Sequence, residues 1–293
     1  MNVWIAGARP RTLPAAAVPV AVGTACAVGG VDGGLIWWRA VASLVVALAL
    51  QVATNYANDY SDGVRGTDSD DRRVGPVRLV GQGLAAPGAV KTAALVAFGV
   101  AGVAGAALAA VVGPELLVVG AAAIAAGWFY TGGPRPYGYA GFGELFVFVF
   151  FGVVATVGST YVQTGTITAL SVAASVPVGF LATALLVINN LRDIPGDTVA
   201  GKRTLAVRIG ELRTRFLYAG LLTATFVAVP LVAGVGQRPV AAAALVGVVL
   251  ARGPVVDVLG GATGSALIPV LESTGRIQLA FGALFAAGIA LGG

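Results

Sequence analysis

Nine long apolar segments constrain this chain of 293 residues more than any other feature. They cover approximately residues 12–30, 37–57, 90–112, 115–131, 142–162, 170–191, 214–234, 239–257 and 276–292. A helix needs about 20 mostly apolar residues to cross the hydrocarbon core of a bilayer. We therefore expect an all-α integral membrane protein with about nine transmembrane helices, in a single transmembrane domain over residues 1–293.

Positive charge lies on one side of this expected topology. If the N-terminus is cytoplasmic, the loops around 58–90, 131–141, 192–213 and 258–275 are cytoplasmic too, and every Lys and Arg except Arg39 and Arg238 falls on that side. Such a bias sets the orientation of membrane proteins. We expect a multi-pass protein of a bacterial-type cell membrane, whose basic charge balance reflects topology and implies no nucleic-acid partner.

The chain contains no histidine and a single cysteine, Cys26, which lies in an apolar segment. This composition excludes Ser-His and Cys-His catalysis, histidine-rich zinc sites, histidine-ligated haem and iron–sulfur clusters. The remaining ligands are oxygen atoms, which favour a hard cation such as Mg²⁺. Any catalysis must use Asp, Asn, Arg, Lys and Tyr.

A cluster of polar residues ends the second apolar segment, where five of the thirteen acidic residues lie within residues 55–71. Asn55, Asp59 and Asp62 are spaced i, i+4, i+7, so a continuing helix would present them on one face, with Asn58 alongside. Polar groups at such depth are functional more often than not. Residues 70–73, by contrast, have the character of a solvated loop.

A second polar cluster ends the sixth apolar segment. Asn189 and Asp193 should share a helix face there, with Asn190 beside them. Pro195 and Gly196 are expected to end the helix before Asp197.

The two clusters occupy corresponding places, each ending an outward-to-inward segment, which suggests two parallel four-helix repeats around one cavity. A divalent cation would relieve the repulsion between the gathered carboxylates. Basic residues follow each cluster and suit a phosphate ligand: Arg65, Arg72, Arg73 and Arg78 after the first, and Lys202, Arg203 and Arg208 after the second.

At these residues the sequence resembles the UbiA superfamily of intramembrane prenyltransferases. Residues 58–62 match its NDxxD motif and residues 193–197 its DxxxD motif, and further similarity lies at 8–14, 130–134 and 189–208. The family pattern has a further Asp where this chain has Gly66, and the nearest acid is Asp68. Within the superfamily the chain is most similar to the enzymes that prenylate 1,4-dihydroxy-2-naphthoate in menaquinone biosynthesis.

The resemblance implies a UbiA-like bundle of two four-helix pseudo-repeats plus a last helix. It implies a Mg²⁺-dependent transfer of a polyprenyl group from polyprenyl diphosphate to 1,4-dihydroxy-2-naphthoate with decarboxylation, which gives demethylmenaquinone. Mn²⁺ should substitute in part. The implied metal ligands are Asn58, Asp59, Asp62, Asp193 and Asp197, and the four aspartates and Tyr130 are the implied catalytic residues. The implied substrate-binding residues are Asn55, Asn58, Arg65, Asp68, Arg135, Tyr139, Asn189, Asn190, Lys202 and Arg203, with Arg11 as a further candidate.

Three alternatives remain at this point. The acceptor could be another aromatic acid such as 4-hydroxybenzoate. A CDP-alcohol phosphotransferase also uses an aspartate-rich metal motif, but residues 64–66 depart from its pattern. A cation-coupled transporter would carry its acids deep within the spans, whereas these cluster at helix ends.

Tyr130 and Arg135 could equally anchor the chain at the membrane interface.

Overall fold

The computed structural model describes residues 2–30, 34–67, 75 and 77–292, and all regular secondary structure within them is helical. The longer helices are α2 (Pro14–Cys26), α3 (Trp37–Val64), α4 (Pro87–Val112), α5 (Glu115–Phe129), α8 (Ala169–Val199), α10 (Glu211–Gly236) and α12 (Leu267–Leu291). Short α1 (Val3–Ala8) precedes them, and α9 (Leu205–Ile209) lies between α8 and α10. α6 (Gly143–Val147) and α7 (Ala155–Thr164) are joined through π-helical turns at Phe148–Val154, and a 3-10 segment at Pro239–Gly247 leads into α11 (Val248–Leu259).

Within the described residues, seven helical stretches are long and apolar enough to cross a membrane: Trp37–Val64, Pro87–Val112, Gly143–Thr164, Ala169–Val199, Glu211–Gly236, Pro239–Leu259 and Gly264–Leu291. The two other expected spans coincide with shorter apolar helices, Pro14–Cys26 and Glu115–Phe129. The chain is thus a multi-pass membrane protein. The expectation of an all-α bundle is confirmed, and the count of nine crossings stays a prediction.

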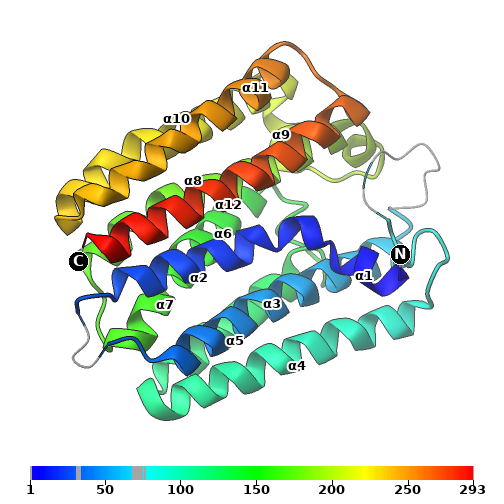
Figure 1. Ribbon diagram of the computed structural model, residues 1–293. Coiled ribbons are helices and arrows are strands. Elements are labelled where there is room, and N and C mark those ends of the chain that lie inside the picture. The colour runs from blue at the N-terminus through cyan, green and yellow to red at the C-terminus, as the bar shows by residue number, and fades with distance from the viewer. Residues whose placement is uncertain (1, 31–33, 68–74, 76, 293) are drawn as a thin grey trace.

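The helices run alongside one another in a bundle (Figure 1). α4 lies at one edge beside α3, α10 and α11 lie at the other, and α12 crosses the middle next to α2. The N-terminus and the last turns of α3 lie at one end of the bundle, and the C-terminus lies at the opposite end (Figure 1). This arrangement agrees with an odd number of crossings.

Among the seven candidate spans the most buried is α8, which packs against α10, α12 and the π-helical turns. Its side chains Leu181, Val187 and Ile188 are fully or almost fully buried and belong to the larger of two hydrophobic clusters. The smaller cluster joins α3 and α4 to the N-terminal segment. α3 and α8 are also the helices that end in the two acidic motifs. Each motif is therefore carried by a helix that packs in one of the two hydrophobic clusters.

Candidate active site

The first acidic motif lies on the last turns of α3, which continues to Val64, beyond the apolar segment. Asn55, Asn58 and Asp62 line a cavity, whereas Asp59 does not. The carboxylate of Asp59 instead accepts hydrogen bonds from the backbone N–H groups of Leu79 and Val80, at 2.8 and 3.0 Å. The expectation that Asn55, Asp59 and Asp62 share one face is therefore wrong for Asp59, which contacts Leu79 and Val80 and does not line the cavity.

The two asparagines of α3 tie neighbouring segments to the cavity wall. The Asn55 amide donates to the carbonyl oxygen of Ala8 at 2.9 Å and to the Thr12 hydroxyl at 3.1 Å. The Asn58 amide oxygen accepts a hydrogen bond of 2.8 Å from the hydroxyl of Thr131. Both side chains are buried, so these bonds fix the segments before α2 and after α5 against α3.

Asp62 is the focus of a charged network. Lys202 donates from Nζ to its carboxylate at 3.0 Å, Arg78 approaches to 3.8 Å, and the Tyr139 hydroxyl donates a short hydrogen bond. The side chain of Asp62 is 3% exposed. Three segments that are far apart in sequence therefore converge on one buried carboxylate.

The second acidic motif lies on the last turns of α8, and here one expectation is wrong. The helix does not end before Asp197; it passes through Pro195 and runs to Val199. Proline removes one backbone donor and kinks a helix. Later bonds hold the next turn, including the one from the amide of Ala200 to the carbonyl oxygen of Gly196 at 2.9 Å. Asp193 and Asp197 consequently sit one turn apart, and both line the cavity.

Arg192 governs the immediate surroundings of Asp193. Its guanidinium contacts both carboxylate oxygens of Asp193, at 2.7 and 2.8 Å, and donates to the amide oxygen of Asn189 at 2.8 Å. Asn189 in turn lies 3.4 Å from Asp193, and the Thr204 hydroxyl lies 3.4 Å from Asp197. The bidentate contact with Arg192 also fixes the orientation of the Asp193 carboxylate.

Both motifs open onto one cavity of about 830 Å³. Its polar end is formed by residues of α3, α8 and the loops that follow them, and its remainder is lined mainly by small and apolar side chains. Ser43 and Asp62 both line it and lie about 28 Å apart along α3 at roughly 1.5 Å of rise per residue. The space is long, polar at one end and apolar along its length.

Glycines form part of the apolar wall. Gly102 and Gly105 of α4, Gly120 of α5 and Gly158 of α7 line the cavity. A Cβ atom added at any of the four would meet nothing within 4 Å. Side chains larger than glycine would therefore reach into open space.

Two tyrosines of the loop between α5 and α6 also line the cavity, namely Tyr130 and Tyr139. The Nζ atom of Lys202 lies 4.8 Å from the centre of the Tyr139 ring. Burial raises the pKa of the Tyr139 hydroxyl, and the neighbouring Asp62 raises it further. Burial is also the main cause that raises the pKa of Tyr130. Both hydroxyls therefore stay protonated, and that of Tyr139 donates a hydrogen bond to Asp62.

Within the described part of the chain, Lys202 is one of three buried cations that line the cavity, with Arg78 and Arg192. Burial lowers the pKa of its amino group, while the charge of Asp62 and the hydrogen bond to it oppose that shift. Because Lys202 follows α8 directly and pairs with Asp62 of α3, it links the two motifs across the cavity.

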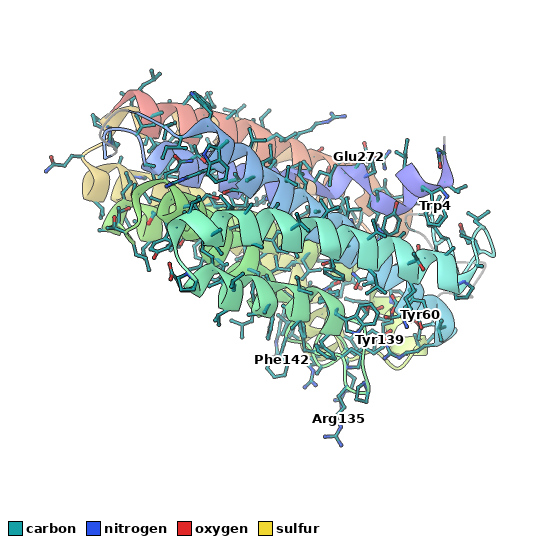
Figure 2. The ribbon with its side chains drawn as sticks, turned by 90° about the horizontal axis from the view of Figure 1, so that it is seen from below. Trp4, Tyr60, Arg135, Tyr139, Phe142 and Glu272 are labelled. Carbon is teal, nitrogen blue, oxygen red and sulfur yellow. The ribbon has the colours of Figure 1, made fainter. Side chains whose placement is uncertain are left out.

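Several predicted residues lie outside the cavity wall. Arg65, Arg135 and Arg203 are exposed and do not line the cavity. Arg65 donates to the carbonyl oxygens of Thr131 and Gly133, so it secures the loop that carries Tyr130. Figure 2 shows Arg135 pointing away from the helices, on the same side of the bundle as Tyr139. Asp68, with residues 70–73, lies outside the described residues.

Arg11 lines the mouth of the cavity and forms a salt bridge of 2.8 Å with Glu272 of α12. The contact joins the segment before α2 to α12. Because Arg11 is mostly exposed, the pair contributes little to stability.

Two residues of this region were not predicted. Arg192 stands beside Asp193 at the polar end of α8, and Glu144 begins an aromatic segment, where it accepts a hydrogen bond of 2.9 Å from Asn190. The available signal was strongest for Glu144, because an ionisable residue within an apolar span marks a functional or paired site.

The donor set around the cavity is compatible with Mg²⁺. Among the described residues, no three acidic, histidine or cysteine side chains gather closely enough to hold a metal ion by themselves. Mg²⁺ commonly binds one or two carboxylates and takes its other ligands from substrate phosphates and water. The cavity offers Asp62, Asp193 and Asp197 for that purpose.

Residues 16–259 match the UbiA prenyltransferase family. The chain is 49% identical over 297 residues to 1,4-dihydroxy-2-naphthoate octaprenyltransferase of Mycobacterium tuberculosis, covering 99% of this chain and 97% of the relative. It is 39% identical over 243 residues to the Escherichia coli enzyme of the same name, covering 78% and 76% of the two chains. A UbiA homologue from Archaeoglobus fulgidus bound to GPP and Mg²⁺ has the same fold, with a TM-score of 0.69, 18% identity and coverage of 98% and 99%.

Proposed function

The chain belongs to the UbiA prenyltransferase family, and we propose that it transfers a polyprenyl group from polyprenyl diphosphate to 1,4-dihydroxy-2-naphthoate, with loss of CO₂, to give demethylmenaquinol, the reduced form of demethylmenaquinone. The observation that carries this proposal is the single cavity lined by Asp62 of α3 and by Asp193 and Asp197 of α8. The name of the mycobacterial relative, which is 49% identical over nearly the full chain, supports the choice of acceptor.

The polar end of the cavity would bind the diphosphate. Lys202, Arg78 and Arg192 all line it and bring positive charge to the same end as the carboxylates. Mg²⁺ held by Asp62, Asp193 and Asp197 would supply Lewis-acid neutralisation of the leaving diphosphate, and Mn²⁺ would replace it in part. The lysine and arginines share that burden by holding the phosphate oxygens in a fixed orientation.

The apolar length of the cavity would bind the prenyl chain and exclude water from its reactive end. As the allylic C–O bond breaks, its electron pair leaves with the diphosphate, and the acceptor ring carbon forms the new C–C bond. The bond from that ring carbon to the carboxylate then breaks, and its electrons restore the aromatic ring as CO₂ departs. No strong base is needed for this sequence, so the absence of histidine is no obstacle.

The aromatic residues near the polar end fit a cationic intermediate. Tyr137 stacks on Phe146 with ring centres 4.0 Å apart, and both rings line the cavity with Tyr130. Ring faces attract positive charge within about 6 Å. We assign these rings to the region where the prenyl cation meets the acceptor.

The proposed orientation in the membrane of the cell places the N-terminus and both acidic motifs at the cytoplasmic face, with nine crossings built as two four-helix repeats and a last helix. Cysteine labelling tests it in a Cys26→Ala background. Thr166→Cys should react with an impermeant thiol reagent in intact cells, and Arg135→Cys should be shielded. The reverse pattern would reject the orientation.

One assay tests the reaction. Purified protein in detergent receives Mg²⁺, a polyprenyl diphosphate and an equimolar mixture of 1,4-dihydroxy-2-naphthoate and 4-hydroxybenzoate. We expect a prenylated naphthalenediol whose mass lacks the carboxyl group. A product that retains the carboxylate, or one built on 4-hydroxybenzoate, would reject the proposed acceptor.

A further inference from the structure

Asp59 is the one acid of the first motif that faces away from the cavity. It is completely buried, and its two carboxylate oxygens each accept a backbone N–H, one from Leu79 and one from Val80. A carboxylate engaged in this way holds a stretch of main chain rather than a ligand in the cavity. Its neighbour Asp62, three residues on, faces the cavity instead.

The stretch of main chain that Asp59 holds is closely fitted to the surrounding helices. Leu79 is fully buried in the cluster that includes Tyr56 and Ala57. A Cβ atom added to Gly7 of α1 would lie 2.7 Å from its side chain. A Cβ atom added to Gly63 of α3 would likewise lie 2.4 Å from the Val80 side chain. Leu79 and Val80 are therefore held in one position against α3.

The position of Leu79 also fixes the main chain of the preceding residue, Arg78. Arg78 is buried, lines the cavity and lies 3.8 Å from Asp62. Slightly earlier in the chain, Gly75 also lines the cavity, and a Cβ atom added there would lie 3.4 Å from the Arg192 guanidinium. The segment that Asp59 anchors thus reaches both acidic motifs.

We propose that Asp59 is a positioning residue, which anchors the main chain at Leu79 and Val80 and so places Arg78 at the diphosphate end of the cavity, and that it is not a metal ligand. This inference rests on the proposed function for the role of Arg78. It replaces the expectation, drawn from the family motif, that Asp59 binds Mg²⁺. In this view the NDxxD motif contains one aspartate that lines the cavity, Asp62, and one that anchors the main chain at Leu79 and Val80, Asp59.

Amide hydrogen exchange tests the anchor without substrate or metal. In the wild-type protein in detergent, the amides of Leu79 and Val80 should exchange slowly because they are bonded to a buried carboxylate. Asp59→Asn should speed the exchange of at least one of the two amides by about tenfold or more, since an amide side chain can accept at only one of its two atoms. Asp193→Asn, the matched control from the second motif, should leave them slow. Equal protection in wild type and Asp59→Asn would overturn the proposal.

Kinetics separate positioning from metal binding. Asp59→Asn and Arg78→Gln should each raise KM for the prenyl diphosphate about tenfold. The double variant should also raise it about tenfold rather than a hundredfold, because the two changes remove the same interaction, the contact of Arg78 with the diphosphate. The Mg²⁺ concentration for half-maximal rate should stay unchanged in Asp59→Asn and rise in Asp62→Asn. A rise in Asp59→Asn equal to that of Asp62→Asn would assign Asp59 to the metal and reject positioning.

Leu79→Val serves if Asp59→Asn does not fold, because it loosens the same anchor without altering a charge. It should raise KM for the prenyl diphosphate and leave the Mg²⁺ requirement unchanged. An unchanged KM would count against the proposal. Inactive wild-type protein would instead reject the proposed function, while the exchange result at residues 79 and 80 would stand by itself.

Discussion

Asp62 at the end of α3 is held by side chains from three other segments, whereas Asp193 near the end of α8 is paired with Arg192, the residue beside it on the same helix. The first carboxylate is 3% exposed and the second 13%. Asp62 therefore depends on the correct assembly of three loops, and Asp193 depends mainly on the local geometry of α8. A change in one of those loops should reach the first motif and spare the second.

Removal of the metal should have the largest effect and should erase the difference between the motifs. EDTA should abolish prenyl transfer, and added Mg²⁺ should restore it, because both motifs would act through the same ions. Diphosphate and Mg²⁺ together should raise Tm by more than the sum of their separate shifts. Turnover that persists in EDTA would separate the acidic motifs from any metal.

Replacing one carboxylate should come next. Asp62→Asn and Asp193→Asn should each lower kcat/KM by about a thousandfold, the size of effect expected when a main electrostatic group is lost. Asp62→Asn should also destabilise the fold by about 3 kcal/mol, because it leaves Lys202 buried beside an uncharged partner. Asp193→Asn should destabilise it less. Thermal unfolding in detergent measures the difference, and equal losses of stability would remove the contrast.

Tyr139→Phe should have an intermediate effect confined to the first motif. The variant removes the hydrogen bond that Tyr139 donates to Asp62 and keeps the ring beside Lys202. Hydrogen bonds to charged groups contribute about 1.5–3 kcal/mol, so kcat/KM should fall by about 10- to 150-fold. In an Asp62→Asn background the same change should have little further effect. Independent, additive losses would indicate that Tyr139 acts elsewhere.

Arg203→Gln should have the smallest effect, a change in kcat/KM of less than about threefold, as is usual for exposed charges. Arg203 follows Lys202 directly but is exposed and outside the cavity wall. Lys202→Gln is the matched comparison and should lower activity far more. Steady-state kinetics of the two variants measure how sharply the site ends, and a large loss in Arg203→Gln would extend the site toward the surface.

The apolar runs predicted most of the fold, because hydropathy reports directly on membrane helices. The last helix shows where that signal fails. The last apolar segment is predicted to start at residue 276, yet α12 begins at Leu267, because Glu272, Ser273 and Thr274 lower the local hydropathy. The fold accommodates two of them, with Glu272 paired to Arg11 and the Thr274 hydroxyl hydrogen-bonded to the hydroxyl of Tyr218 on α10. Long-range partners of this kind leave no periodic trace in the sequence.

The acidic motifs themselves were predicted, but not the direction in which each side chain points. Spacing placed Asp59 with Asp62, and only the tertiary contact with Leu79 and Val80 distinguishes them. Pro195 misled for a related reason. Local rules end a helix near proline, but α8 tolerates the loss of one backbone bond and continues to Val199.

The glycines of the cavity wall have an evolutionary consequence. Gly102, Gly105, Gly120 and Gly158 border open space, and no atom of either acidic motif lies within 4 Å of a Cβ atom added at any of them, so a larger side chain there should narrow the cavity without touching those motifs. Substrate length and reaction chemistry are thereby placed under separate selection. A lineage could change the isoprenoid tail of its product by single substitutions, one codon at a time, while the residues that perform the transfer stayed the same.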